Sequence, residues 1–275
     1  MTMRSPQFIF IVPLISRALA DAWDMVSHNL DCTLRSALGN EGARIRVVVA
    51  HHEMPDSSLI GDPRVITLSA PFEPNIDPKL GSYDKHKKRN LAASFIRNNF
   101  GESYIMFLDA DDLVHRNLAS SCIDARAHAY TIANGYQWDL SRNIFRANDE
   151  KFHHSCGSSF VGYFSAEQLP KDWDDYENPF FRINRKPHRS FGEVASREGK
   201  ECRALSLRAC VYKLNHPASL RGMKMIDSGA DSPIRGVSRK NIFEAEEASG
   251  ILAHDFSQDM TDLSDFGLND ARRSS

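Results

Sequence analysis

The sequence has little of what marks several large classes of protein. It contains five cysteines in 275 residues, and none forms a C-x-x-C pair, which argues against a disulfide framework and a structural zinc site. The charges nearly balance, with 34 basic and 36 acidic side chains, so the basic excess of a nucleic-acid-binding protein is missing. The longest early apolar run, residues 8–15, is too short to cross a bilayer and lacks the flanks of a signal peptide. We therefore expect a cytoplasmic protein that binds no nucleic acid and has no membrane span.

Other motifs are also missing. There is no internal repeat, no G-x-S-x-G motif of the kind that carries a nucleophilic serine, and no glycine-rich loop after the first apolar run. Hydrophobic residues make up 41% of the chain and charged residues 25%, which is typical of a folded globular protein. The length fits one large domain or two small ones.

What is present is an alternation of apolar strands and amphipathic helices. Short β-branched runs predict strands, and apolar residues spaced three and four apart predict helices. Strands are expected at 8–15, 44–52, 63–71 and 104–112, and helices at 17–38 and 88–100. This order predicts an α/β domain with a mainly parallel central sheet.

The second half is less regular. Residues 166–187 are expected to form a loop, and Ser190 with Glu193 predicts a capping box at the start of a helix. Further helices are expected at 113–134, 190–199 and 239–253, an extended segment at 135–145, and a strand at 204–214. The polar end of the chain is expected to be mobile.

The most informative motif is the acidic sequence DADD at 109–112, directly after an apolar strand. In open α/β sheets, ligands bind at this end of the strands. Asp109 and Asp111 would supply hard oxygen ligands that suit Mg²⁺ or Mn²⁺, and the cation could hold a diphosphate. The alternative is a solvated acidic turn that caps the next helix.

In this order, the motifs resemble the nucleotide-sugar glycosyltransferases of the GT-A fold, especially bacterial relatives of the large inverting family that includes chitin and cellulose synthases. FIFIVPLI is similar to their first strand, CTLRSALGN to the end of their first helix, and YIMFLDADDLV to the strand with the D-x-D motif. The resemblance covers roughly residues 8–220. It implies a single Rossmann-like GT-A domain at 1–222, divided into a nucleotide-binding half (1–112) and an acceptor half (113–222). A partly helical extension with a mobile end would follow at 223–275.

The resemblance also implies roles for individual residues. Asp109 would lie near the ribose and Asp111 would bind the metal ion, Mn²⁺ or Mg²⁺. His216, in YKLNHPASL, stands where many such enzymes place a third metal or diphosphate ligand, although a lone histidine after a strand is more often structural. The residues expected to contact the nucleotide-sugar are Pro13, Ile15, His51, Glu53, Asp84, Lys85, Lys88, Asp109, Ala110 and Asp111.

Two of these contacts have specific reasons. Where the family has an Asp-rich turn for the nucleobase, the second strand ends in His51-His52-Glu53, and His51 or Glu53 could bind the uracil or ribose. That strand end could equally face solvent. The basic cluster at 84–89 opens a helix, where side chains and free backbone N–H groups favour phosphate; it could also be a solvated charged face.

The catalytic base is expected at an altered position. The family commonly places an acidic pair before a helix that ends at a glycine, followed by a strand and a histidine. Here the matching elements are the helix at 190–199, the strand at 204–214 and His216, and Pro187-His188 occupies the place of the acidic pair. His188 is therefore the candidate base, since an imidazole can accept a proton near neutral pH. The alternative is a surface histidine in a basic loop. The other candidate bases are Asp172, Asp174, Asp175, Glu177 and Glu193.

The function implied is metal-dependent glycosyl transfer. A hexosyl group would pass, with inversion of its configuration, from a UDP-sugar to a hydroxyl of a glycan or lipid-linked saccharide, as in polysaccharide biosynthesis. One alternative is nucleotidyl transfer to a sugar phosphate, which the missing glycine-rich loop disfavours. The other is a non-catalytic module that binds nucleotide or glycan on a degenerate GT-A scaffold.

Overall fold

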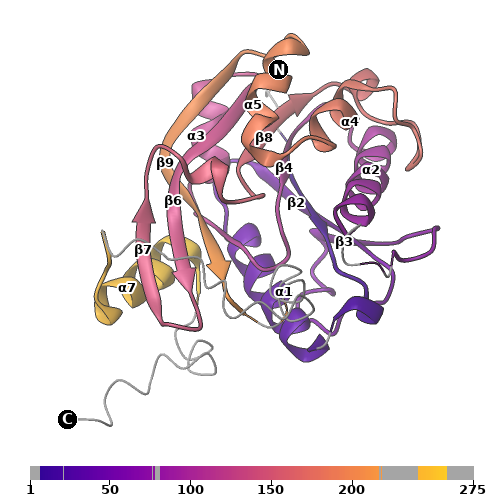
Figure 1. Ribbon diagram of the computed structural model, residues 1–275. Coiled ribbons are helices and arrows are strands. Elements are labelled where there is room, and N and C mark those ends of the chain that lie inside the picture. Colours follow the sequence, from indigo (N-terminus) through magenta and orange to yellow (C-terminus); the bar gives the residue numbers. More distant parts are fainter. Residues whose placement is uncertain are drawn as a thin grey trace.

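The computed structural model describes residues 7–20, 22–75, 77, 81–216, 218 and 241–258. The strands are β1 (Gln7–Pro13), β2 (Arg44–His51), β3 (Val65–Ser69), β4 (Ser103–Phe107), β5 (Leu113–Val114), β6 (Ala129–Asp139), β7 (Ile144–Asn148), β8 (Phe160–Phe164) and β9 (Cys202–Leu214). They form one nine-stranded sheet in the order β3-β2-β1-β4-β8-β6-β9-β5, with β7 paired to β6 (Figure 1). Six strands, β1 to β4 with β6 and β9, run in the same direction. The predicted α/β fold with a mainly parallel central sheet is confirmed.

Helices cover both faces of this sheet. The longer helices are α1 (Trp23–Leu38), α2 (Gly81–Asn99), α3 (Leu118–Ala125), α4 (Pro179–Asn184), α5 (Phe191–Arg197) and α7 (Ala245–Phe256). Phe8 and Phe10 of β1 pack with α1 and α3, whereas Ile9 and Ile11 pack with α2, α4 and α5. Because both faces of β1 are buried, its sequence is apolar at every position rather than alternating.

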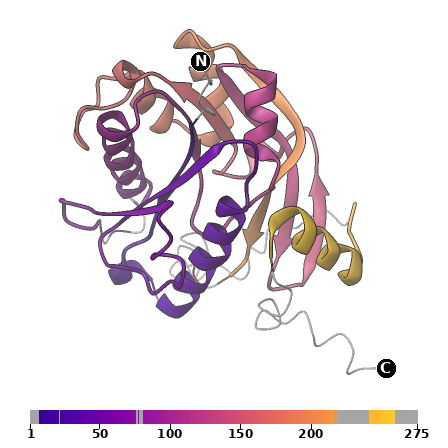
Figure 2. The same cartoon turned by 180° about the vertical axis from the view of Figure 1, so that it is seen from behind.

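The far end of the sheet has a core of its own. Tyr136 of β6 stacks on Phe145 of β7 with ring centroids 5.0 Å apart. Leu252 and Phe256 of α7 complete this cluster and are 1% and 0% exposed. Figures 1 and 2 both show α7 beside the β6–β7 hairpin. The helix expected at 239–253 is therefore part of the fold, whereas the expected mobile end of the chain lies outside the described residues.

Three sequence-based predictions in the second half need correction. The helix expected at 113–134 is only α3, because the chain enters β6 at Ala129 and pairs there with β8 and β9. The loop expected at 166–187 contains α4, which Asn178 caps by accepting the Phe181 N–H at 2.8 Å. The capping box at Ser190 does not form, because a 3₁₀ turn, η5 (His188–Ser190), leads directly into α5 and Ser190 makes no side-chain cap.

Two expected absences can be compared with the described residues. All five cysteines are free thiols, as expected for a chain without a disulfide framework. No described helix is long and apolar enough to cross a membrane.

The packing of α7 leads to a prediction about stability. Phe256→Ala should lower the free energy of unfolding by about 3–5 kcal/mol, because it empties a fully buried site in the β6–β7–α7 core. Glu247→Ala, at an exposed position of the same helix, is the control and should change it by less than about 0.5 kcal/mol. Denaturant titration measures both. Equal, small effects would show that α7 is dispensable to the fold.

Candidate functional site

The site is built around Asp109, which lies two residues beyond Phe107, the last residue of β4. Its carboxylate lies 2.6 Å from the Lys85 ammonium and 3.1 Å from the Arg89 guanidinium. These cations stand four residues apart on α2 and therefore share one face of the helix. Arg89 is 2% exposed and its guanidinium lies 4.6 Å from the ring centre of Phe107. Burial alone would raise the pKa of Asp109, but Lys85 and Arg89 hold it below its usual value.

The second acid, Asp111, is paired with a histidine from the other half of the chain. The end of β9 brings His216 to it, with Nε2 3.0 Å from the Asp111 carboxylate. His216 is 3% exposed, and its Nδ1 is buried without a partner. The structure thus brings together two of the three predicted metal ligands, whereas both oxygens of Asp109 already contact Lys85.

The ligating atoms of Asp111 and His216 decide which cation this pair could hold. Asp111 offers a carboxylate oxygen and His216 an imidazole nitrogen, a set that suits Mn²⁺. No group of three or more His, Cys, Asp or Glu able to hold a metal occurs in the described residues. Mg²⁺ and similar cations are often held by one or two protein ligands together with water and substrate phosphates. The pair therefore fits a cation that is completed by a diphosphate.

The third acid, Asp112, is part of the framework. It is fully buried, and its carboxylate accepts hydrogen bonds from Ser158 Oγ at 2.6 Å and Cys156 Sγ at 3.3 Å. Ser158 Oγ in turn accepts the backbone N–H of Asp109 at 2.8 Å. Burial, and then the charges of Asp111 and Asp109, raise the pKa of Asp112 well above its usual value. Asp112 thus ties the loop at 156–158 to the end of β4.

That loop approaches Asp109 very closely at Gly157. A Cβ atom on Gly157 would lie 2.6 Å from a carboxylate oxygen of Asp109 and 3.3 Å from the Lys85 ammonium. Only a residue without a side chain fits there unless the ion pair moves. The close approach explains why a glycine stands at this position of the CGSS sequence.

His188 lies beside this cluster. Its Nδ1 donates to the backbone carbonyl of His153 at 2.7 Å, since a carbonyl can only accept. In the neutral ring, this bond leaves the lone pair on Nε2. Burial lowers the pKa of His188, and the nearby charge of Lys85 lowers it further, while Asp109 opposes the shift. The imidazole is therefore neutral, and able to accept a proton, at neutral pH.

The alternative bases have other contacts. The Asp175 carboxylate accepts the backbone N–H groups of Lys171 and Glu177 at 2.9 and 3.1 Å, and these bonds lower its pKa. Glu193 is exposed on α5 and forms an ion pair with Arg197 at 2.5 Å. Asp172 accepts the N–H of Trp173. Of the candidates, His188 is the one that these contacts place beside Asp109.

Some of the side chains expected to contact the nucleotide already have partners within the protein, and others do not. His51, at the end of β2, is 3% exposed and neither ring nitrogen has a hydrogen-bond partner. Lys88 is fully buried and is held by Asp84 and by the Leu14 carbonyl, both at 2.7 Å. Asp84 also contacts His52 at 2.9 Å. Lys88 and Asp84 therefore brace this end of α2, and Lys85 is the more accessible cation.

The other expected contacts lie close to these strand ends. Pro13 is buried at the end of β1, and Ile15 follows it in the chain, partly buried. Glu53 accepts the backbone N–H of Arg17 at 3.0 Å. Ala110 lies between the two acids that it separates in sequence and is partly buried.

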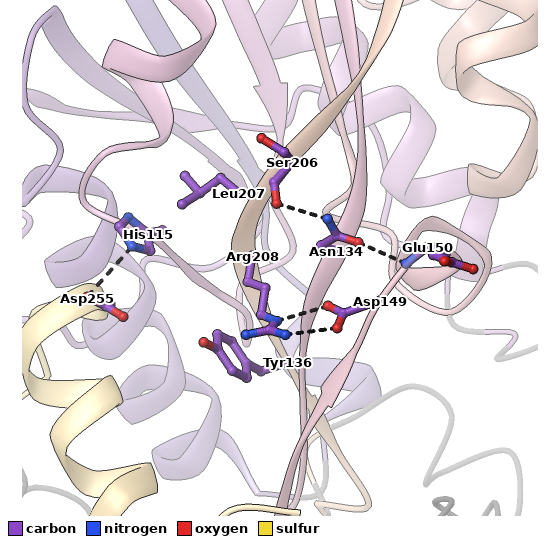
Figure 3. Close-up of a pocket in the computed structure, with 9 residues that line it drawn as sticks. All are labelled: His115, Asn134, Tyr136, Asp149, Glu150, Ser206, Leu207, Arg208 and Asp255. Carbon is purple, nitrogen blue, oxygen red and sulfur yellow. Dashed lines mark hydrogen bonds and ion pairs between the residues drawn. The ribbon is translucent and has the colours of Figure 1, made fainter. Parts of the chain in front are cut away.

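A separate hollow of about 570 Å³ lies between the middle of β6 and β9 and the end of α7 (Figure 3). Arg208 and Asp149 form two hydrogen bonds across it, each 2.9 Å long. Asn134 donates to the Ser206 carbonyl and accepts the Glu150 N–H. None of its lining side chains has a buried polar atom without a partner. Arg208, Asp149 and Asn134 thus have hydrogen-bond partners within the hollow, and none of the lining residues is a predicted site residue.

The chain matches known proteins by structure and not by sequence. No protein-family model matches the sequence, and no curated protein matches it significantly. The structure is similar to S. aureus TarS at 13% identity and a TM-score of 0.39, over 97% of this chain and 50% of that one. It is also similar to a Desulfovibrio desulfuricans G20 protein provisionally named a nucleotide-diphospho-sugar transferase, at 10% identity and a TM-score of 0.35, over 86% of this chain and 92% of that one. The chain thus spans half the length of the TarS structure.

The close approach at Gly157 leads to a prediction. Gly157→Ala should destabilise the protein by about 1–3 kcal/mol, because the added methyl group overlaps the Asp109–Lys85 pair. Gly250→Ala is the control, since a Cβ there meets nothing within 4 Å on an exposed part of α7. That change should stabilise by about 0.5–1 kcal/mol. Thermal or denaturant unfolding measures both, and a neutral Gly157→Ala would show that the loop does not press on Asp109.

Proposed function

We propose that the protein is a glycosyltransferase that moves a sugar from a nucleoside diphosphate, with UDP the expected nucleotide, to a hydroxyl of a saccharide acceptor. The observation that carries this proposal is the convergence of four groups at the carboxyl end of β4. Asp111 and His216 offer two ligands for a cation, and Lys85 and His188 lie near Asp109, which is two residues from Asp111 in the chain. A hydrolytic nucleophile is not among them. The arrangement suits transfer between a bound diphosphate and a hydroxyl.

The donor diphosphate would be held by charge. Asp111 and His216 would hold Mn²⁺ or Mg²⁺, and the cation would neutralise the charge that develops on the departing diphosphate. Lys85 is the accessible ammonium beside this position, with 28% of its side chain exposed. Arg89 would remain on Asp109 if Lys85 turned to phosphate, so that the partly buried carboxylate would keep a partner.

The nucleobase would lie at the end of β2. The neutral ring of His51 has one donor and one acceptor nitrogen, and both are buried without a partner. Burial lowers the pKa of His51, and Lys88 lowers it further, which keeps the ring neutral. One of these nitrogens would pair with the N–H or a carbonyl oxygen of a uracil; the two point in divergent directions and therefore do not bind one edge of the base together.

His188 would act as the general base. Its Nδ1–H is fixed on the His153 carbonyl, so its Nε2 can take the proton of the acceptor hydroxyl as that oxygen attacks the sugar. Attack from the face opposite the leaving diphosphate would invert the configuration of the sugar.

The cation site is tested by Asp111→Asn, which removes a charged ligand and keeps the size of the side chain. Affinity for UDP should become independent of Mn²⁺, whereas the thermal midpoint without ligand should move little. Asp124→Asn, at an exposed position of α3, is the matched control and should retain the Mn²⁺ effect. Calorimetric titration of UDP with and without Mn²⁺ makes the comparison. An unchanged Mn²⁺ effect in Asp111→Asn would contradict the assignment.

The base is tested by turnover and its pH dependence. Since the pKa of His188 lies below its usual 6.5, wild-type turnover should be flat near neutral pH and fall only at lower pH, as the ring gains a proton. His188→Ala should lose roughly 10²–10⁴ in kcat at nearly unchanged donor affinity, and the acidic limb should disappear. Release of UDP from a panel of UDP-sugars with saccharide acceptors provides the assay. A variant that keeps most of its turnover rules out the base role, and UDP binding without any turnover in the wild type favours a non-catalytic module.

A further inference from the structure

The segment that carries His188 also carries cations that no carboxylate neutralises. Arg185, Lys186 and Arg189 are exposed, and none forms an ion pair with any described residue. Each stands within three residues of His188, so its Cα lies within about 11 Å of the histidine Cα. Because these side chains are long, flexible and exposed, their charged ends can turn toward a molecule bound at the imidazole.

Cations farther from His188 in the same part of the chain do have partners. Arg182 of α4 lies 2.7 Å from Glu198. Arg197 of α5 lies 2.5 Å from Glu193. The protein as a whole has a formal charge of −2, so unpaired cations beside His188 are a local excess.

A second element adds to this charge. The hydrogen bond from His188 to the His153 carbonyl joins the segment to the short turn η3 (Phe152–His154). Lys151, directly before that turn, is exposed and also has no ion pair among the described residues. Its neighbour Glu150 offsets part of the charge, whereas Asp149 is already neutralised by Arg208 at 2.9 Å.

We propose that these four cations form the entrance for an anionic acceptor, one that carries a carboxylate or phosphate group close to the hydroxyl that is glycosylated. The inference rests on the proposed function, because it takes His188 to face the acceptor. Arginine binds carboxylate and phosphate with two parallel hydrogen bonds, and both arginines are free to do so. Since the cations are exposed, they act mainly by attracting and orienting the acceptor, and added salt weakens their effect.

The test compares three probes that differ in charge: 4-nitrophenyl glucuronide, 4-nitrophenyl glucose-6-phosphate and the neutral 4-nitrophenyl glucoside. Their affinities are measured by NMR titration at low and high salt in the presence of UDP and Mn²⁺, and their use as acceptors is measured with UDP-sugars. The variants are Lys186→Glu and Arg189→Glu. Arg126→Glu is the control, because Arg126 is exposed at the end of α3, an element that carries none of the four cations.

Charge reversal at Lys186 or Arg189 should weaken binding of an anionic probe roughly tenfold at low salt, and less at high salt. The neutral probe, and every probe with Arg126→Glu, should change by less than about twofold. A response of one anionic probe alone identifies the acceptor group as carboxylate or phosphate. Equal affinity of the wild type for neutral and anionic probes overturns the inference, as do variants that weaken UDP binding instead. Anion preference without sugar transfer would refute the enzymatic proposal alone, and transfer with equal use of all three probes would refute the anionic acceptor alone.

Discussion

A partly buried carboxylate at the end of a strand needs partners, and the pairing of Asp109 with Lys85 and Arg89 meets that need. An isolated charge there would cost several kcal/mol. Because both cations come from one face of α2, the ion pairs also fix α2 against β4. Gly157 can lie against the same carboxylate only because it has no side chain, and Ser158 then accepts the Asp109 N–H. The positions of the helix, the strand end and the loop all depend on this one charge balance.

The same balance separates the roles of the three acids. Asp109 forms ion pairs with Lys85 and Arg89, and the buried Asp112 accepts hydrogen bonds from Ser158 and Cys156. Asp111 is the remaining acid. Its partner is His216, and the two side chains could bind one cation together. Three carboxylates within four residues thus have different partners, and the proposed function assigns ligand binding to Asp111 alone. This division follows from what each side chain touches and not from the type of residue.

Local sequence was sufficient where one interaction dominates. The apolar run of β1 predicted a buried strand, which the structure confirms, because burial on both faces leaves few alternatives. The acids after β4 predicted a ligand site, and the structure brings Lys85, Arg89 and His216 to two of them. Local sequence failed where partners are distant. Nothing in residues 113–134 shows that Ala129 and Tyr130 will pair with β8 and β9 instead of continuing a helix. The contacts of Arg89, Gly157 and His153 with the site were missed for the same reason. The Asn178-Pro179 start of α4 did carry a local signal, an N-cap followed by proline, that could have been recognised.

In the proposed function, the end of β4 holds a nucleoside diphosphate through a cation shared by Asp111 and His216. A crystal structure of the protein with UDP and Mn²⁺, with the manganese located by its anomalous scattering, tests this directly. We expect a single strong peak within coordination distance of Asp111 and His216, about 2.0–2.3 Å, with the diphosphate of UDP as its next neighbour. UDP bound at this strand end without a manganese peak, or manganese and UDP bound in another part of the molecule, would contradict it.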